Sequence, residues 1–158
     1  MFWKADADSP RVLVPPPIIF LTFFLAGWGI DWLTGWSLPL SQTLRFGGTA
    51  VLIGASGLIL IAALWCFLRE RVNPEPWKTT RAIIERGIYA YSRNPIYLGM
   101  ALLYVGVAVL LASPGALILL PPVLLVIRIQ VIAREERYLE GKFGDPYRAY
   151  QAKVRRWI

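Results

Sequence analysis

Three long tracts without a single Lys, Arg, Asp or Glu dominate the pattern of the chain. They span residues 12–30, 46–68 and 94–127. Ser113-Pro114-Gly115, a combination typical of a turn, interrupts the third tract. Because a membrane-spanning helix needs about 20 apolar residues, the pattern predicts an all-α polytopic membrane protein. We expect a single domain over residues 1–158 with four spans, the last two forming a hairpin, at residues 12–36, 44–68, 95–112 and 116–133.

Composition and charge agree with a location in the bilayer. The chain of 158 residues is 56% hydrophobic and 17% charged, with a net charge of +7. Residues 69–93 and 128–158 hold 6 and 8 of its 17 Lys and Arg residues. The positive-inside rule places these two segments, and with four spans both termini, in the cytoplasm. We therefore expect the basic excess to face anionic lipid headgroups and not nucleic acid.

The N-terminus and the rarer residue types narrow the possible chemistry. Asp6 and Asp8 stand where a signal peptide has basic residues, so a cleaved signal peptide is not expected. The chain has no His, which excludes a His base or a His-ligated metal, and we expect no metal. Cys66 is the single Cys and cannot form a disulfide within the chain. Any chemistry must use Arg, Glu, Asn, Tyr and backbone groups.

Polar residues gather where the third span begins. In the sequence YSRNPIYLGM, Asn94 is expected to cap the helix and Pro95 to occupy its first turn. A helix N-terminus favours an anion, and Arg93 adds a clamp for a carboxylate or a phosphate. Glu135 and Glu136 are expected at the same membrane level, at the end of the fourth span. Seven residues earlier, Arg128 is predicted on the same helix face as Glu135 but deeper in the bilayer.

An anion-binding helix start opposite two carboxylates would suit a zwitterion or a nucleoside. Tyr89, Tyr91 and Tyr97 could add aromatic faces for a base or a cation. The same residues are also compatible with an ordinary membrane interface, and the pattern alone leaves both open. Gly99 and Gly106 lie on one face of the third span and permit close helix contact, either within the chain or between chains.

The tail, residues 134–158, is predicted to be helical and cytoplasmic. The fourth helix should continue to Phe143, and Asp145 with Pro146 should cap and start a new helix. Its apolar face would carry Tyr147, Tyr150, Val154 and Ile158, suited to the membrane surface or to the ends of the spans.

Two ordered motifs resemble a known family. The sequences ERGIYAYSRNPIYLGM and REERYLEGKFGDPYRAYQAKVRRWI resemble the isoprenylcysteine carboxyl methyltransferase and phospholipid methyltransferase superfamily of membrane enzymes. The resemblance covers residues 80–158. It implies that S-adenosylmethionine binds at the cytoplasmic side, with the tail completing the site. The implied cofactor-binding residues are Tyr89, Tyr91, Arg93, Asn94, Pro95, Tyr97, Gly99, Glu135 and Glu136. Many relatives have His at the position of Asn94, which cannot relay a proton at neutral pH.

The combined expectation is a membrane methyltransferase that acts on a lipophilic acceptor from the bilayer, a carboxylate, an amine or a thiol. Arg128 is the candidate for orienting the acceptor, and Glu135 is the second candidate catalytic residue. A proton-coupled exporter that uses Asp31 is one alternative, although the position of Asp31 near the interface favours simple hydration. A noncatalytic lipid-binding protein is another. Trp28, Trp32 and Trp36 are expected to form an interfacial belt.

Overall fold

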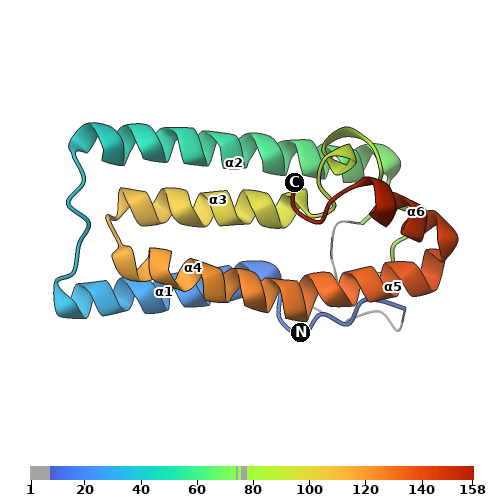
Figure 1. Cartoon of the computed structure of the whole chain (residues 1–158), viewed down its shortest axis with the longest axis horizontal. Coiled ribbons are helices and arrows are strands. Elements are labelled where there is room, and N and C mark those ends of the chain that lie inside the picture. The colour runs from blue at the N-terminus through green and yellow to red at the C-terminus, as the bar shows by residue number, and fades with distance from the viewer. Residues whose placement is uncertain (1–7, 74, 76–77) are drawn as a thin grey trace.

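The computed structural model describes residues 8–73, 75 and 78–158, so Asp6 lies outside the described residues. These residues form helices and no strands. Long helices lie side by side, and the shorter elements gather at one end of the molecule (Figure 1). The elements are α1 (Pro16–Thr34), α2 (Gln42–Glu70), η1 (Gly87–Ala90), α3 (Pro95–Leu110), α4 (Pro114–Ile127), η2 (Arg128–Ile132), α5 (Ala133–Phe143) and α6 (Asp145–Lys153).

Three of the described helices are long and apolar enough to cross a membrane. They are α1, α2 and the continuous helix Pro114–Phe143, which contains α4, η2 and α5. The remaining apolar helix, α3, has 16 residues and is shorter than a typical span. The prediction of an all-helical integral membrane protein is confirmed. The predicted first span, 12–36, was too long at both ends, because Pro15 precedes the helix and Gly35, in a left-handed conformation, ends it.

Glycines set the contact between α2 and α3. A side chain added at Gly106 would lie 2.9 Å from Cγ1 of Ile53, and one at Gly99 would lie 2.8 Å from Leu60. Ser56 donates a hydrogen bond to the Gly99 carbonyl oxygen at 2.7 Å. The close contact foreseen for Gly99 and Gly106 is therefore made within the chain. Gly99 packs α3 against α2 instead of lining a cavity.

A buried carboxylate joins α1 to α4. Asp31 has 5% of its surface exposed, and it accepts hydrogen bonds from the Ser113 hydroxyl and from the Gly115 amide, the latter at 2.9 Å. The expectation that Asp31 is simply hydrated was wrong, because the hairpin turn lies over this face of α1. Gly27 and Gly115 make the approach possible, since a side chain on Gly115 would lie 2.5 Å from the Gly27 carbonyl oxygen.

The long helix changes its winding where it leaves its apolar part. Arg128–Ile132 forms a π-helical turn, which takes in an extra residue and rotates the rest of the helix by about 100°. Arg128 and Glu135 therefore do not share a face, contrary to the prediction, and the Arg128 side chain is exposed. The charged sequence Arg134–Arg137 comes after the apolar run, so the apolar part of this long helix ends before α5.

Two predicted helix caps were also wrong. The Asn94 side chain makes no cap hydrogen bond to α3, although Pro95 begins the helix. Gly144, with φ of 61°, precedes α6, so Asp145 is its first helical residue and not its cap. Helix α6 ends at Lys153, and Ile158, with 75% of its surface exposed, is not part of its buried face.

Candidate active site

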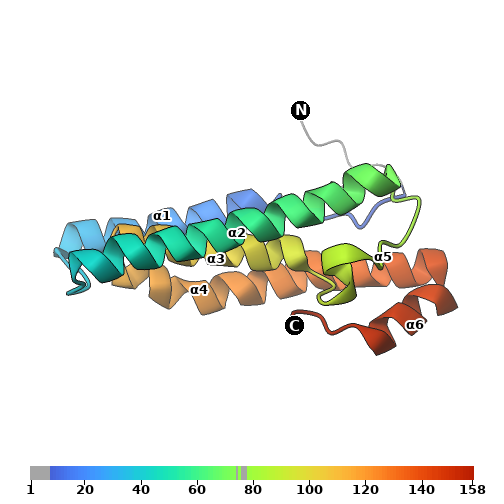
Figure 2. The same ribbon diagram turned by 90° about the horizontal axis from the view of Figure 1, so that it is seen from above.

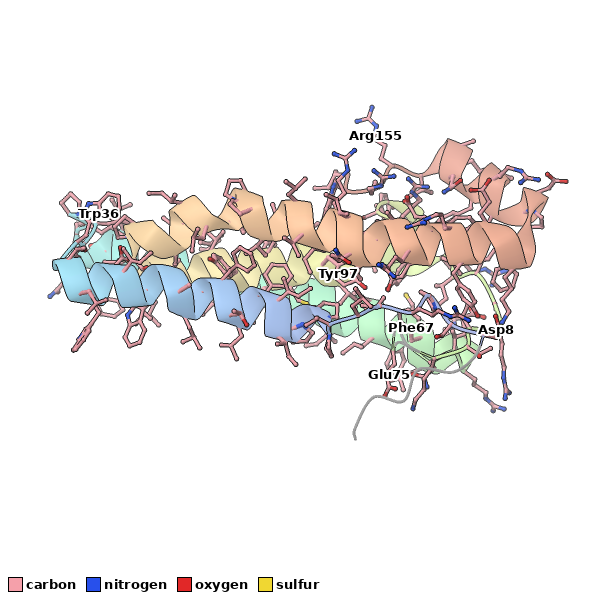
Figure 3. The ribbon with its side chains drawn as sticks, turned by 90° about the horizontal axis from the view of Figure 1, so that it is seen from below. Asp8, Trp36, Phe67, Glu75, Tyr97 and Arg155 are labelled. Atoms are coloured by element: carbon pink, nitrogen blue, oxygen red, sulfur yellow. The ribbon has the colours of Figure 1, made fainter. Side chains whose placement is uncertain are left out.

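Helices α5 and α6 and the short element η1 gather at one end of the molecule (Figure 2). Residues of all three line a cavity of about 140 Å³. Trp36 lies at the opposite end, and Phe67, Tyr97 and Asp8 lie in the half that holds the cavity (Figure 3). The walls come from the end of α2, the start of α3, one face of α5, residues of α6 and the segment 73–84. The cavity therefore forms only when segments far apart in the sequence fold together.

Arg93, just before α3, lines this cavity and is held by a buried ion pair. Its guanidinium lies 3.1 Å from Glu136, and the two side chains are 11% and 12% exposed. Arg156 donates to both oxygens of the same carboxylate, from Nη2 to Oε2 at 2.7 Å and from Nε to Oε1 at 3.1 Å. The Nε of Arg93 is buried and has no hydrogen-bond partner among the described residues. One donor of Arg93 thus remains available for a ligand.

The last residues of the chain pack against the start of α3. The Asn94 amide group donates to the Arg156 carbonyl oxygen at 2.9 Å, and the Arg93 backbone N–H donates to the Arg155 carbonyl oxygen at 3.0 Å. Trp157 packs against the main core cluster. Asn94 therefore binds the C-terminal segment, where the sequence predicted a helix cap.

Glu135 faces the cavity from α5 and accepts a hydrogen bond from the Tyr97 hydroxyl at 2.7 Å. Among the described residues, no Lys or Arg forms an ion pair with it. The pKa of the Glu135 carboxyl is raised from 4.5 to about 7, mainly by burial; the Tyr97 hydrogen bond acts against this rise and the neighbouring Glu136 adds to it. The two adjacent glutamates are therefore in different states, since Glu136 is paired with cations and Glu135 is not.

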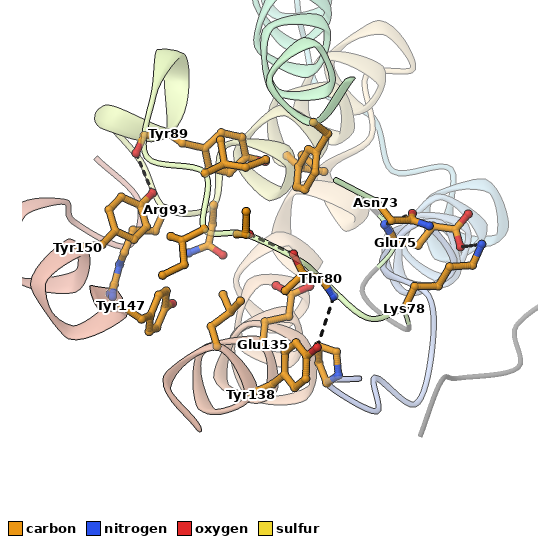
Figure 4. Close-up of a pocket in the computed structure, with 18 of the residues that line it drawn as sticks. Asn73, Glu75, Lys78, Thr80, Tyr89, Arg93, Glu135, Tyr138, Tyr147 and Tyr150 are labelled. Atoms are coloured by element: carbon orange, nitrogen blue, oxygen red, sulfur yellow. Dashed lines mark hydrogen bonds and ion pairs between the residues drawn. The ribbon is translucent and has the colours of Figure 1, made fainter. Parts of the chain in front are cut away.

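Aromatic rings form much of the wall. Tyr89 stacks edge-on against Phe67, with ring centroids 5.6 Å apart, and its carbonyl oxygen accepts a hydrogen bond from Tyr150 at 2.7 Å. Tyr147 and Tyr150 of α6 are buried and line the cavity from the other side. Figure 4 shows Tyr89, Tyr147 and Tyr150 around Arg93. The face of α6 that the sequence assigned to the membrane surface or to the span ends closes the cavity.

The Tyr138 hydroxyl links α5 to Asp8 and to Thr80 by hydrogen bonds. It donates to the Asp8 carbonyl oxygen at 3.2 Å and accepts from the Thr80 amide at 3.3 Å and from Lys142 at 2.9 Å. Lys142 also forms an ion pair with the Asp8 carboxylate at 2.5 Å. Figure 4 shows the contact between Thr80 and Tyr138 at the edge of the cavity. Thr80, in the segment after α2, is therefore held at the edge of the cavity.

The structure brings together part of the predicted site. Five of the predicted residues line the cavity, namely Tyr89, Arg93, Asn94, Tyr97 and Glu135. Glu136 stands behind Arg93 as its ion-pair partner. Tyr91 is 77% exposed, while Pro95 and Gly99 are buried in helix contacts. Like Arg128, these three lie outside the cavity lining. The functional roles assigned to all of these residues stay predictions.

Sequence reasoning missed several residues of the site. Tyr138 lies three residues after Glu135 on a helix, and this spacing could have placed both on one face. Tyr147 and Tyr150 were recognised as one face but were not assigned to a cavity. Arg156 gave no signal, because a basic residue near the end of a basic tail has no pattern that distinguishes it.

These features define a class of protein, an all-helical membrane protein with a polar and aromatic cavity at one end of its spans. Residues 74–146 match the model of a family described as phospholipid methyltransferase. The resemblance predicted from the two motifs is therefore confirmed over this part of the chain, which is a little less than half of it.

A Haemophilus influenzae protein described as uncharacterized is 66% identical to this chain over 35 residues. The match covers 22% of this chain and 56% of the relative, so the chain spans little more than half the length of that relative. No solved structure matches the chain.

Proposed function

We propose that the protein transfers the methyl group of S-adenosylmethionine to a lipophilic acceptor at the membrane surface. The observation that carries this proposal is that Arg93 and Glu135 line one aromatic cavity, in a part of the chain that matches a methyltransferase family. A cation and a carboxyl group in the lining of one cavity suit the two charges of an amino acid, and tyrosine rings suit a purine base.

The residues that line the cavity have the chemical groups that S-adenosylmethionine needs for binding. The unpartnered Nε of Arg93 can donate to the methionine carboxylate, and Glu135 can accept from the ammonium group or a ribose hydroxyl. Tyr89, Tyr147 and Tyr150 offer aromatic contacts. Because pockets for ligands of this size measure about 300–1,000 Å³, the cavity of about 140 Å³ must widen. We expect the segments tied to Tyr138 to move outward during binding.

When bound, S-adenosylmethionine would supply an electrophilic methyl group, which an aligned nucleophile takes as the thioether S-adenosylhomocysteine leaves, and this transfer needs no metal. The contribution of this chain is then to align the two reactants and to exclude water. Glu135 is placed to hold a proton-bearing group at the cavity wall, with Tyr97 fixing the orientation of its carboxylate at 2.7 Å. An acceptor with a proton to lose could give that proton to Glu135, and a carboxylate acceptor needs no such step.

We place the cavity on the cytoplasmic side of a membrane that the chain crosses four times, with the short helix α3 as the third span. The basic residues near the cavity favour this orientation by the positive-inside rule. Arg128, exposed where α4 ends, is suited to orient the carboxylate or phosphate of an acceptor that arrives from the bilayer. An Arg128→Ala variant with normal cofactor binding and normal turnover would contradict that role.

Calorimetric titration of the detergent-purified protein with S-adenosylmethionine and S-adenosylhomocysteine tests the proposal. We expect micromolar binding by the wild type and its loss in Arg93→Ala and Glu135→Ala. The control is Glu140→Gln on the same helix, which alters only an exposed ion pair with Arg148 and should bind normally. Absence of binding by the folded wild type in lipid would refute the proposed function.

A further inference from the structure

The two adjacent glutamates of α5 have different surroundings. Glu135 lines the cavity and has Tyr97 as its hydrogen-bond donor. Glu136 does not line the cavity, and both of its oxygens are held by guanidinium groups, those of Arg93 and Arg156. A carboxylate that is 12% exposed and shared by two cations is already satisfied. It has little capacity left for a ligand.

Arg93 and Arg156 belong to two segments that lie far apart in the sequence. Arg93 precedes α3, and Arg156 lies in residues 154–158, which come after α6 without helical structure and which we call the C-terminal strap. Carbonyl oxygens of the strap accept hydrogen bonds from the Arg93 amide and from the Asn94 side chain. Glu136 therefore stands between the strap and the helix start and forms an ion pair with the arginine of each.

Without this carboxylate, two guanidinium groups would face each other at a partly buried position. Their repulsion, together with the loss of a charge-assisted pair, would push the strap away from α3. Asn94 and the Arg93 backbone would then lose their partners in the strap. The cavity wall would lose the fixed orientation of Arg93, whose Nε is the donor left for a ligand.

We propose that Glu136 is a positioning residue that fixes the C-terminal strap and Arg93 through its two ion pairs and does not itself contact the ligand. Ligand contact and positioning are then divided between Glu135 and Glu136. The part of this proposal that concerns ligand binding rests on the proposed function, whereas the part that concerns the strap does not. In this proposal the C-terminal strap holds Arg93 and Asn94 in place in the cavity wall.

Limited trypsin digestion without any ligand, monitored by mass spectrometry of the intact chain, tests the role in holding the strap. Arg155 is exposed and its carbonyl oxygen is engaged by Arg93, so cleavage after Arg155 reports release of the strap. We expect Glu136→Gln to accelerate this cleavage by at least about tenfold. Glu135→Gln and the exposed control Glu140→Gln should cleave like the wild type. Unchanged cleavage in a folded Glu136→Gln protein would overturn the proposal.

Arg156→Gln keeps the test decisive if Glu136→Gln does not fold. This variant breaks only the ion pair from the strap side and leaves the pair between Arg93 and Glu136 in place. It should also accelerate cleavage after Arg155. A protected strap in Arg156→Gln would count against the proposal independently, and Glu136→Asp, which retains the charge, should restore part of the protection.

Titration with S-adenosylhomocysteine tests whether Glu136 touches the ligand. If it acts only through the strap, Glu136→Gln and Arg156→Gln weaken binding through one shared cause, and the double variant binds no worse than the weaker single variant. If the double variant instead loses affinity by the product of the two single losses, Glu136 contacts the ligand, and its assignment as a positioning residue is overturned. If the wild type binds no ligand, the proposed function fails, but the digestion still decides the role of Glu136 in holding the strap.

Discussion

The raised pKa of Glu135 predicts that this residue destabilises the folded protein at neutral and alkaline pH. Glu135→Gln is the informative perturbation, because the amide has nearly the same shape and its oxygen can still accept the Tyr97 hydrogen bond that now measures 2.7 Å. The substitution removes the charge and keeps the packing. Its effect on stability therefore isolates the cost of holding a carboxylate in the cavity wall.

The pKa sets the magnitude of the effect. A rise in the pKa of the Glu135 carboxyl from 4.5 to about 7 corresponds to about 3 kcal/mol, at about 1.4 kcal/mol for each tenfold change in acidity. Solvent reaches part of the side chain and reduces this value, so we expect about 2 kcal/mol. The variant should be more stable than the wild type by about that amount at pH 8.

The sign of the pH dependence of stability depends on whether the folded or the unfolded state binds more protons. Between about pH 4.5 and pH 7 the folded protein keeps a proton on Glu135 that the unfolded chain has lost. The folded state then binds more protons, so this group lowers stability as the pH rises through that range. Below about pH 4.5 the carboxyl is neutral in both states, and the advantage of Glu135→Gln should disappear.

Thermal unfolding in detergent at pH 4.5 and at pH 8 measures this difference. The wild type and Glu135→Gln should unfold at similar temperatures at pH 4.5, and the variant should unfold several degrees higher at pH 8. Glu140→Gln serves as a control, since Glu140 forms only an exposed pair and should show no such pH dependence. The same advantage for Glu135→Gln at both pH values would refute the reasoning, as would a loss of stability at pH 8.

Three further substitutions test the fold. Asp31→Ala should lower the free energy of unfolding by about 1–3 kcal/mol, measured by denaturation in detergent, because the Gly115 amide loses its buried acceptor; a neutral effect would contradict the pairing. Gly115→Ala should destabilise the protein measurably in the same assay, since its side chain would lie 2.5 Å from the Gly27 carbonyl oxygen, and Gly141→Ala, with nothing within 4 Å, is the control. Arg148→Gln should leave stability unchanged in the same assay, because its ion pairs are exposed; a clear loss of stability would show that α6 depends on them.

The sequence by itself determined the helical membrane class and the neighbourhood of the site. Uncharged tracts of about 20 residues leave few alternatives to membrane helices, because unpaired backbone groups are too costly in lipid. The two motifs placed Arg93, Asn94 and Glu135 at one end of the spans, and all three line the cavity. The helix boundaries depended on local residues such as Pro95, which begins α3, and Gly144, which precedes α6.

Tertiary structure alone decided which polar groups pair. Asp31 became a buried acceptor because the turn before α4 lies over it, and no periodicity in α1 reveals that contact. Glu136 forms ion pairs with Arg93 and Arg156, which are 43 and 20 residues away in the sequence. Charge pairing depends on distances in space, whereas sequence patterns report only spacing along one helix. The same limit explains the wrong prediction for Arg128. A π-helical turn rotates the helix after this residue, and the residue types in the sequence do not predict such a turn.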